Sequence, residues 1–325
     1  MQAIQITAPG ETQFVEVDIP ALKPGHALIR TQRLSLCGSD VFFLHYMPAD
    51  YYPAPAGATG HEVVGEVVAV DAPGSGINVG DVALVIAPEQ TAMAEYYLAQ
   101  AENVLRLPPG RPIEELLQAQ QLGTVIYACR QLPNVVGKDV AIVGQGSAGL
   151  WFDFMLRRLG ARRIIAVDLQ AHRLAAGRLY GATNTIHNGG ENEGLDVAAM
   201  VADLTQGQMV DVAVVAAGEV DAVNLAVSLL KMNGLLFCFG VPHEQQFMFD
   251  YGRFFLQNLQ AKAVVGAYAE PGHASTWLAM EMIANGTINV APILTHRFPF
   301  SQVPAAYELQ RTRDEGSIKI VIEMP

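Results

Sequence analysis

Three residues in the first part of the sequence are of the types that bind zinc in proteins. His61 and Glu62 lie between glycines at the start of a valine-rich run, GATGHEVVGEVVAV at 57–70, and Cys37 lies 24 residues earlier in SLCGSD. Zinc accepts thiolate, imidazole and carboxylate ligands, and a catalytic zinc site leaves one position open for water or substrate. An isolated His-Glu pair is most often part of a polar loop, and a lone cysteine is most often a small buried apolar residue. The three together, beside the second motif described next, indicate a metal centre.

A glycine-rich turn follows an apolar run in the middle of the chain. The stretch VAIVGQGSAG at 140–149 has the pattern Gly-x-Gly-x-x-Gly between a predicted strand and a predicted helix. In dinucleotide-binding domains the first glycine permits a tight turn, the second lets backbone approach the pyrophosphate, and the third lets the helix pack on the strand. The helix N-terminus adds the positive end of its dipole. The residues predicted to bind a cofactor here are Gly144, Gln145, Gly146, Ser147, Ala148 and Gly149.

A carboxylate at the end of the next apolar run indicates which cofactor binds. Asp168 lies 19 residues past the last glycine of the turn. A carboxylate there accepts hydrogen bonds from the adenosine ribose and repels the 2′-phosphate of NADP, so NAD is the expected cofactor. Arg173, five positions further on, is a second candidate for cofactor binding, because a guanidinium could meet a phosphate. Its place in the helical pattern AHRLAAGRL favours instead a solvated helix face.

The composition excludes several classes of partner. The chain has 325 residues, of which 51% are hydrophobic and 16% charged, and this fits a compact protein of two domains. A net charge of −12 argues against nucleic acid or an anionic membrane as partner, because both require clustered Lys and Arg. The sequence has no signal-peptide pattern, no apolar run near the ~20 residues that span a bilayer, and no disulfide framework. We therefore expect a cytoplasmic protein with a small-molecule substrate.

The pattern of apolar residues changes near residue 112. Before it, short apolar runs alternate with Gly- and Pro-rich turns, which is typical of an antiparallel, β-rich domain. After it, the stretch 113–132 has apolar residues three and four apart and predicts a helix. From Val140 onward, apolar runs alternate with helical patterns, which predicts a doubly wound parallel sheet. The expected central strands, covered on both faces, are DVAIVG, RIIAVD, VDVAVVAAG, GLLFCFGV and AKAVVGAY.

The order of these motifs resembles that of one enzyme family. CGSD, GHEVVGEVV, GDVALV, the glycine-rich turn and the terminal AAYELQ and GSIKIVIE resemble zinc-dependent medium-chain dehydrogenases/reductases, the alcohol dehydrogenase family, over essentially the whole chain. LCGSDV and LGTVIYACRQL are most similar to the branch of sorbitol (polyol) and threonine dehydrogenases. The resemblance implies an α/β fold with a β-rich GroES-like catalytic domain at 1–121 and 268–325 and a Rossmann NAD-binding domain, a doubly wound parallel sheet, at 122–267. It also implies a homodimer or homotetramer.

The resemblance further implies roles for individual residues. Cys37 and His61 match zinc ligands of the family, and Glu62 matches a glutamate that ligates zinc or waits beside it. Ser39 matches the hydroxyl that relays the substrate proton, and Asp40 matches a partner of the zinc-binding histidine, which would fix the tautomer of the ring. The implied reaction is an NAD-dependent oxidation of a secondary alcohol such as a polyol, sugar or hydroxy acid, with one catalytic zinc per subunit.

Three positions depart from the family pattern. A further zinc-ligand position, Cys or Glu in relatives, aligns with Gln120, whose amide is a poorer zinc ligand than a carboxylate or a thiolate. Only IAPEQTAM stands where the family's lobe of four cysteines would lie, so no structural zinc is expected. Phe42 occupies the place of a histidine that passes the proton onward in many relatives. The site would then rest on Cys37, His61, Glu62 and water.

Two alternative functions are compatible with the same residues. One is a zinc-free reductase of the same superfamily, acting on an activated alkene or a ketone. The other is a protein that binds NAD(H) without turnover, and the amide at Gln120 together with Phe42 favours it. The aromatic segment 42–59 supplies either the walls of a substrate pocket or the packing of a lid.

Overall fold

The chain folds into two units, each built around its own sheet. The computed structural model describes residues 1–268 and 270–325. The first unit comprises 1–124 and 267–325, and the second comprises 125–266. A β-rich unit and a unit with a doubly wound parallel sheet are present, so the predicted fold class is confirmed. In the described part of the chain, no helix has both the length and the apolar character needed to cross a lipid bilayer.

The first unit is built on a mainly antiparallel sheet. The sheet has seven strands in the order β14-β15-β3-β4-β5-β7, with β6 paired to β3, and β1 and β2 form a separate hairpin. The strands are β1 (Gln2–Ala8), β2 (Glu11–Glu16), β3 (His26–Ser35), β4 (Glu62–Asp71), β5 (Val82–Ile86), β6 (Tyr96–Gln100), β7 (Val104–Arg106), β14 (Leu294–Pro299) and β15 (Lys319–Glu323). The helices are α1 (Gly38–His45), α2 (Ile113–Leu117), α9 (Ala274–Ala284) and α10 (Val303–Thr312), and α3 (Ala119–Arg130) continues into the second unit.

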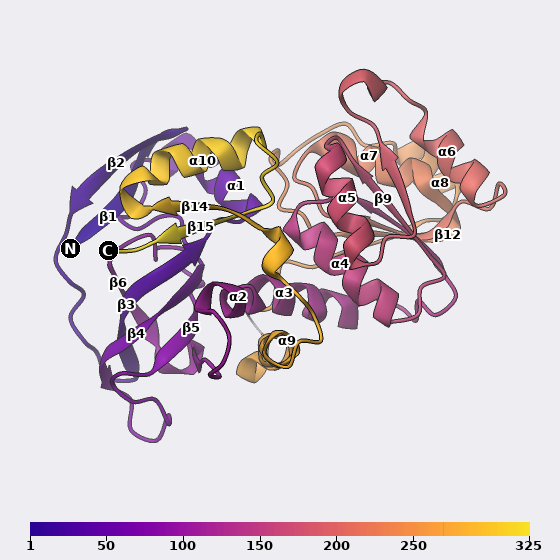
Figure 1. Ribbon diagram of the computed structural model, residues 1–325. Helices are drawn as coiled ribbons and strands as arrows, with labels where there is room; N and C mark the ends of the chain where they lie inside the picture. The colour runs from indigo at the N-terminus through magenta and orange to yellow at the C-terminus, as the bar shows by residue number, and fades with distance from the viewer. Residues whose placement is uncertain (269) are drawn as a thin grey trace. The chain divides into compact units, whose positions relative to one another are not determined.

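Strands from the two ends of the chain are neighbours in this sheet. β15 pairs antiparallel with β3, and β3 in turn pairs with β4, so the last strand lies next to strands of the first 71 residues. Figure 1 shows β14 and β15, in yellow, beside the indigo strands of the N-terminal part. At the β3–β4 pairing, a Cβ on Gly65 would lie 2.4 Å from the carbonyl oxygen of Arg30. Glycine therefore permits the close approach of these two strands.

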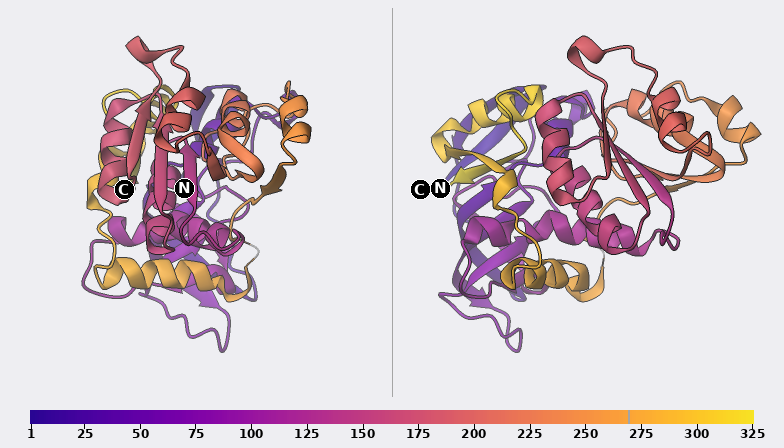
Figure 2. Two further views of the ribbon diagram at one scale, coloured as in Figure 1. Left: turned by 90° about the vertical axis from the view of Figure 1, so that its right-hand side faces the viewer. Right: turned by 45° about the vertical axis from the view of Figure 1, so that its right-hand side comes forward.

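The second unit is a parallel sheet covered by helices. Its six strands have the order β10-β9-β8-β11-β12-β13. They are β8 (Asp139–Val143), β9 (Arg163–Asp168), β10 (Asn184–His187), β11 (Val210–Val215), β12 (Leu230–Cys238) and β13 (Gln260–Ala263). The helices are α4 (Ser147–Arg158), α5 (Ala171–Tyr180), α6 (Val197–Leu204), α7 (Val220–Leu229) and α8 (Tyr251–Leu256). Helices α4 and α5 lie together on one face of the sheet, and α6, α7 and α8 lie on the other (Figures 1 and 2).

The strand order of this sheet identifies its ligand-binding end. The chain runs from β8 outward to β9 and β10, and then returns to β11 on the other side of β8 before continuing to β12 and β13. In open α/β sheets, ligands bind at the carboxyl ends of the strands where the order reverses, which here is between β8 and β11. The glycine-rich turn begins directly after β8. The fold thus places the predicted cofactor residues at the reversal point.

The outermost strand of the second unit differs from the expectation. Four of the five predicted central strands are buried strands of the sheet, and the short strand β10 is an additional edge that the sequence did not indicate. The fifth, AKAVVGAY at 261–268, contributes only residues 261–263 to β13, and all four residues of β13 are exposed. The prediction that this strand is covered on both faces is wrong, because β13 is an edge strand that helices leave open.

Candidate functional site

The candidate metal centre begins at the first turn of α1. Cys37 follows β3 and caps α1, and its backbone N–H donates to Oδ2 of Asp40 at 2.7 Å as part of a reciprocal capping box. Asp40 is buried, and its other oxygen, Oδ1, lies 3.4 Å from Nδ1 of His61. One carboxylate therefore orients both the backbone of Cys37 and the ring of His61. This leaves Nε2 of the ring available to face a metal.

Glu62 is the first residue of β4, and its carboxylate is fully buried. Nζ of Lys319 lies 2.8 Å from Oε1 and 2.6 Å from Oε2, and the hydroxyl of Ser35 donates to Oε2. Lys319 begins β15 and is itself fully buried. Sequence reasoning missed Lys319, although a single lysine in the apolar strand KIVIE was a signal, because a buried ammonium requires a buried acid.

The three predicted metal ligands converge in space. The ligand atoms of Cys37, His61 and Glu62 lie within 4.8 Å of one another, and among the described residues they form the one such group of at least three His, Cys, Asp or Glu side chains. A thiolate, an imidazole and a carboxylate at this separation form a donor set that zinc accepts, with a position left for water or substrate. The residues present therefore fit a zinc ion.

The ionisable groups of the cluster shift one another's pKa values. Burial and the charge of Glu62 raise the pKa of the Cys37 thiol, but the hydrogen bond with His61 and the charge of Lys319 outweigh them, so the net pKa is lowered. Burial lowers the pKa of His61, but the charge and hydrogen bond of Asp40 raise it well above the ordinary value. The pKa of Asp40 is lowered, because His61 outweighs the effect of burial. The shift of Cys37 is toward the thiolate, which is the form that binds metals, whereas a bound metal would have to displace the proton that the raised pKa of His61 retains.

The amide expected near the zinc site comes from a different residue. Gln121, not Gln120, faces the centre: its Nε2 donates to Sγ of Cys37 at 3.3 Å, and the side chain is buried. Gln120 is half-buried, and its backbone carbonyl accepts a hydrogen bond from Thr124 within α3. The amide next to the sulfur is therefore that of Gln121, the neighbour of the residue singled out in the sequence. An amide N–H that donates to the sulfur stabilises a thiolate rather than adding a ligand.

Two further predictions concern the helix α1 and the segment after it. Ser39 lies in the first turn of α1 and is half-buried, and its hydroxyl has no hydrogen bond to a described residue.

The aromatic rings of the segment 42–59 pack on one another. Phe43 lies against Tyr51 and Tyr51 against Tyr52, and the hydroxyl of Tyr52 donates to the carbonyl of Phe43. Tyr51 and Tyr52 also pack against the core of the first unit. Packing is therefore the role that the contacts of these two tyrosines support.

The glycine-rich turn has the backbone that cofactor binding requires. Gly144 has φ +99°, a conformation that favours glycine, and a Cβ on Gly149 would lie 2.1 Å from the carbonyl oxygen of Gly144. Gly146 caps α4, whose first two residues are Ser147 and Ala148. The N–H groups at the start of this twelve-residue helix and the close packing of helix on turn fit a pyrophosphate.

Two charged residues flank the turn. Asp168, the last residue of β9, accepts a hydrogen bond from the backbone N–H of Gln145 at 2.6 Å and another from Gln170 at 2.8 Å. Arg173 is buried rather than on a solvated face of α5, so that expectation is wrong. A Cβ on Gly146 would lie 3.8 Å from Nη1 of Arg173. The guanidinium is therefore next to the turn, where an anionic group of a cofactor would lie.

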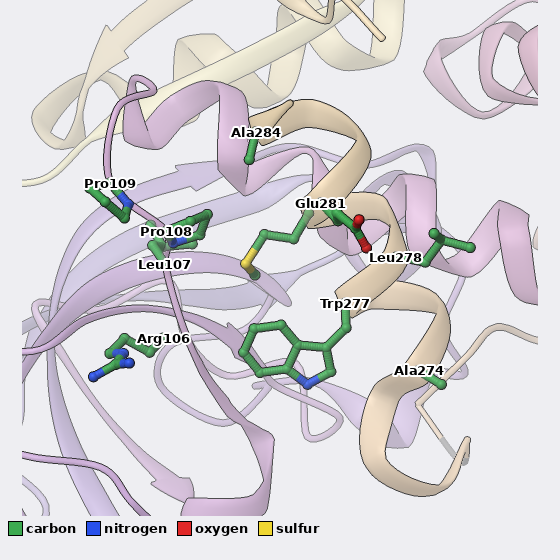
Figure 3. A pocket seen from close by; sticks show the side chains of 10 residues that line it. Arg106, Leu107, Pro108, Pro109, Ala274, Trp277, Leu278, Glu281 and Ala284 are labelled. Carbon is green, nitrogen blue, oxygen red and sulfur yellow. The ribbon is translucent and has the colours of Figure 1, made fainter. Parts of the chain in front are cut away.

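A separate groove of about 840 Å³ lies in the first unit between α9 and the segment 106–109. Figure 3 shows the indole of Trp277 extending from α9 toward that segment. Its described lining is mostly apolar and includes none of the metal-centre residues. This groove is therefore not the place where the candidate site would act.

Comparisons with known proteins agree with this arrangement. Residues 23–109 match the family model described as an alcohol dehydrogenase GroES-like domain, and residues 149–284 match the model described as a zinc-binding dehydrogenase. An L-threonine 3-dehydrogenase of Pectobacterium carotovorum is 24% identical over 98% of both chains, and the sorbitol dehydrogenase of Mus musculus is 24% identical over 99% of this chain and 95% of its own. An alcohol dehydrogenase from Thermus sp. ATN1 has the same fold, with a TM-score of 0.83, 23% identity and full coverage of both chains.

These matches define a two-domain dehydrogenase fold with a GroES-like unit and a Rossmann unit. The chain belongs to the zinc-dependent medium-chain dehydrogenase/reductase family, the family of the alcohol dehydrogenases. The relatives compared above are oxidoreductases by name, and the predicted family resemblance is confirmed.

The buried ion pair of Glu62 and Lys319 yields a prediction about stability. Replacing Lys319 by Met leaves the Glu62 carboxylate buried without a cation, so the free energy of unfolding should fall by about 3–5 kcal/mol. The control is Lys231, which also pairs with an acid, Asp211, but whose side chain is 40% exposed. Lys231→Met should therefore lower the free energy of unfolding by about 1 kcal/mol or less. Chemical denaturation followed by circular dichroism measures both. Equal effects of the two substitutions would contradict the assigned role of the buried pair.

Proposed function

We propose that this protein is an NAD-dependent dehydrogenase that oxidises a secondary alcohol, such as a polyol, sugar or hydroxy acid, with one catalytic zinc held by Cys37, His61 and Glu62. The observation that carries the proposal is the convergence of these three ligand atoms within 4.8 Å in the same chain as a dinucleotide-type glycine turn. Threonine and sorbitol, for which two relatives are named, both carry secondary hydroxyl groups, and this supports the substrate class.

The residues of the chain have separate tasks in this reaction. When bound, zinc lowers the pKa of an alcohol as it does that of water, and NAD accepts the hydride. Asp40 holds the ring of His61 so that Nε2 faces the metal, and Gln121 donates to the sulfur of Cys37. Lys319 keeps Glu62 paired, so a bound metal would share this carboxylate with the ammonium. Ser39, whose hydroxyl is not engaged by a described residue, would receive the proton of the substrate.

The preference for NAD over NADP rests on Asp168. Each oxygen of its carboxylate accepts one backbone N–H, and each retains lone-pair capacity for a ribose hydroxyl. Its negative charge at this point would repel a 2′-phosphate. Arg173 lies next to Gly146, and its positive guanidinium would attract a negatively charged group of the cofactor. We propose that these two residues hold the adenosine half of NAD.

A homo-oligomer is also part of the proposal. The edge strand β13 has free backbone hydrogen-bonding groups along one side, and edges of this kind pair readily with a second chain. Large apolar side chains are exposed nearby in sequence, with Phe255 67% and Leu256 76% exposed on α8. Together they form a surface of the second unit that a second copy of the chain could bury. No structural zinc is proposed, because the segment between β5 and β6 has no cysteine.

Metal content tests the proposed centre. Protein purified without added metal should contain about one zinc per chain, and Cys37→Ser should lose most of it because a thiolate ligand is removed. Cys238→Ser, which removes a cysteine outside the cluster, is the matched control and should keep the metal. Elemental analysis gives the ratio. Absence of zinc from the wild type, with reductase activity unaffected by chelators, would instead favour the zinc-free reductase.

Cofactor titration tests the assignment of Asp168. Fluorescence titration should show NADH binding at least about tenfold more tightly than NADPH, since one charge repulsion of this kind is worth roughly 1.4 kcal/mol or more. Asp168→Ser should reduce the difference between the two affinities, because the variant should bind NADH more weakly and NADPH more tightly than the wild type does. Tighter binding of NADPH by the wild type would refute the NAD assignment. Tight NADH binding without turnover of any alcohol in a broad panel would favour the non-catalytic alternative.

Light scattering tests the oligomer. The wild type should have the mass of a dimer or tetramer, and a double substitution of Phe255 and Leu256 by Glu should shift the mass to that of a monomer, because charged residues are not readily buried. Leu179, 74% exposed on α5, provides the control for each single substitution, since Leu179→Glu replaces one exposed apolar residue by Glu outside the proposed surface. A monomeric wild type would overturn this part of the proposal.

A further inference from the structure

A carboxyl group is buried beneath the glycine-rich turn and has no role in the reaction described above. Asp153 lies in α4, four residues past Gly149, and its side chain is fully buried. Among the described residues, no Lys, Arg or His forms an ion pair with it, and neither of its oxygens has a well-formed hydrogen bond. An ionised carboxylate in such surroundings would be strongly destabilising. The group therefore requires another way to be satisfied.

The polar side chain beside Asp153 is that of Gln145, the second residue of the turn. Gln145 is also fully buried, and neither Oε1 nor Nε2 has a well-formed hydrogen bond to a described residue. A Cβ on Gly177 of α5 would lie 2.6 Å from Oε1 of Gln145 and 3.1 Å from Oδ2 of Asp153. Glycine at position 177 thus leaves the space in which the amide and the carboxyl meet, between α4 and α5.

A neutral carboxylic acid and a primary amide have matching hydrogen-bonding groups. The acid O–H can donate to Oε1 of Gln145, and Nε2 can donate to the acid carbonyl. With one proton on Asp153, all four polar atoms of the two side chains therefore have a hydrogen-bonding partner. If Asp153 were ionised, it could only accept hydrogen bonds, and Oε1 of Gln145 would be left without a donor. Burial raises the pKa of Asp153 well above the ordinary value, against a smaller opposing effect of the Gln145 amide.

Charged groups on the surrounding elements do not change this conclusion. Asp153 lies on α4, which packs against α5, β8 and β9. The other charged or titratable groups on these four elements are Asp139, Arg157, Arg158, Arg163, Asp168, His172, Arg173, Arg178 and Tyr180. Burial and the Gln145 amide are the influences acting on the pKa of the carboxyl, and no charge contributes. The protonation of Asp153 is thus set by its burial.

The same glutamine connects this pair to the cofactor residues. The backbone N–H of Gln145 donates to Oδ2 of Asp168 at 2.6 Å, and Gln145 lies between Gly144 and Gly146 in the turn. A displacement of the Gln145 side chain would therefore move both the turn and the carboxylate proposed to bind ribose. The position of the buried amide is coupled to the shape of the cofactor site.

We propose that Asp153 is held as a neutral carboxylic acid and, through the Gln145 amide, positions the glycine-rich turn and Asp168 for the cofactor. Asp153 is thus a positioning residue, and its loss of a proton at alkaline pH releases Gln145 and weakens cofactor binding. The effect on cofactor binding rests on the proposed function, whereas the protonation of Asp153 does not.

Stability measured against pH tests the protonation alone. The native state keeps a proton on Asp153 that the unfolded chain loses in the ordinary carboxyl range, so the stability from this group is complete at low pH and is lost as pH rises through the native pKa. Asp153→Asn replaces the acid with a neutral amide that can pair with Gln145 in the same way. Relative to this variant, the wild type should lose stability between about pH 5 and pH 9. Asp203→Asn, which removes an exposed carboxylate of α6, should show no such divergence.

NADH affinity over the same range tests the positioning role. At acidic pH the wild type and Asp153→Asn should bind NADH equally. At alkaline pH, once the stability of the wild type has stopped falling relative to the variant, the wild type should bind NADH about tenfold more weakly. Asp153→Leu, which leaves the amide unpaired, should bind more weakly at every pH.

The outcomes separate the two proposals. Parallel stability profiles of wild type and Asp153→Asn would overturn the neutral acid. Diverging stability with parallel NADH affinities would overturn the positioning role. Absence of NADH binding by every variant, with diverging stability, would refute the proposed cofactor and with it the positioning role, while the neutral acid would stand.

Discussion

The buried ion pair between Glu62 and Lys319 is the interaction on which the first unit most depends. It joins β4 to β15 across β3, and Ser35 of β3 donates to the same carboxylate. Neither charged group reaches solvent, so each would be strongly destabilising without the other. The last strand, paired with β3, therefore supplies the cation that the carboxylate at the start of β4 requires. The candidate metal centre near the N-terminus thus depends on a residue from the end of the chain.

Asp40 connects local helix formation to the geometry of the metal centre. Its contact with the backbone of Cys37 spans three residues and forms when α1 forms, because it is part of the helix cap. His61 reaches the same carboxylate from the start of β4, so the sheet and the helix must both be in place before the ring is oriented. The thiol and the imidazole are thereby fixed through one buried group, and little reorganisation is left for the metal to drive.

Residue type and strand pattern carried most of what the sequence could predict. The parallel sheet was recognisable because covered strands are largely apolar. The run AKAVVGAY looked alike, but the strand there is β13, whose sequence QAKA is exposed and includes two polar residues. Gln121 was missed because one position on a helix turns a side chain by about 100°, and the sequence does not show which of two adjacent glutamines faces Cys37. Lys319 and Glu62 are 257 residues apart, and nothing local identifies such a partner. Arg173 follows a helical pattern typical of a solvated face, but the adjacent turn leaves room to bury it.

Glu62 in the first unit and Asp153 in the second are both fully buried, and the partner of each carboxyl group decides the form that is stable. Glu62 has an ammonium and a hydroxyl, so a negative charge is compensated and is available to a cation. Asp153 has an amide, which offers both a donor and an acceptor and is matched only by a group that can also donate. Moving a lysine next to Asp153, or an amide next to Glu62, would exchange these forms. The difference suits the two ligands, since a metal centre needs anionic donors, whereas a turn that binds a pyrophosphate is best kept free of additional negative charge.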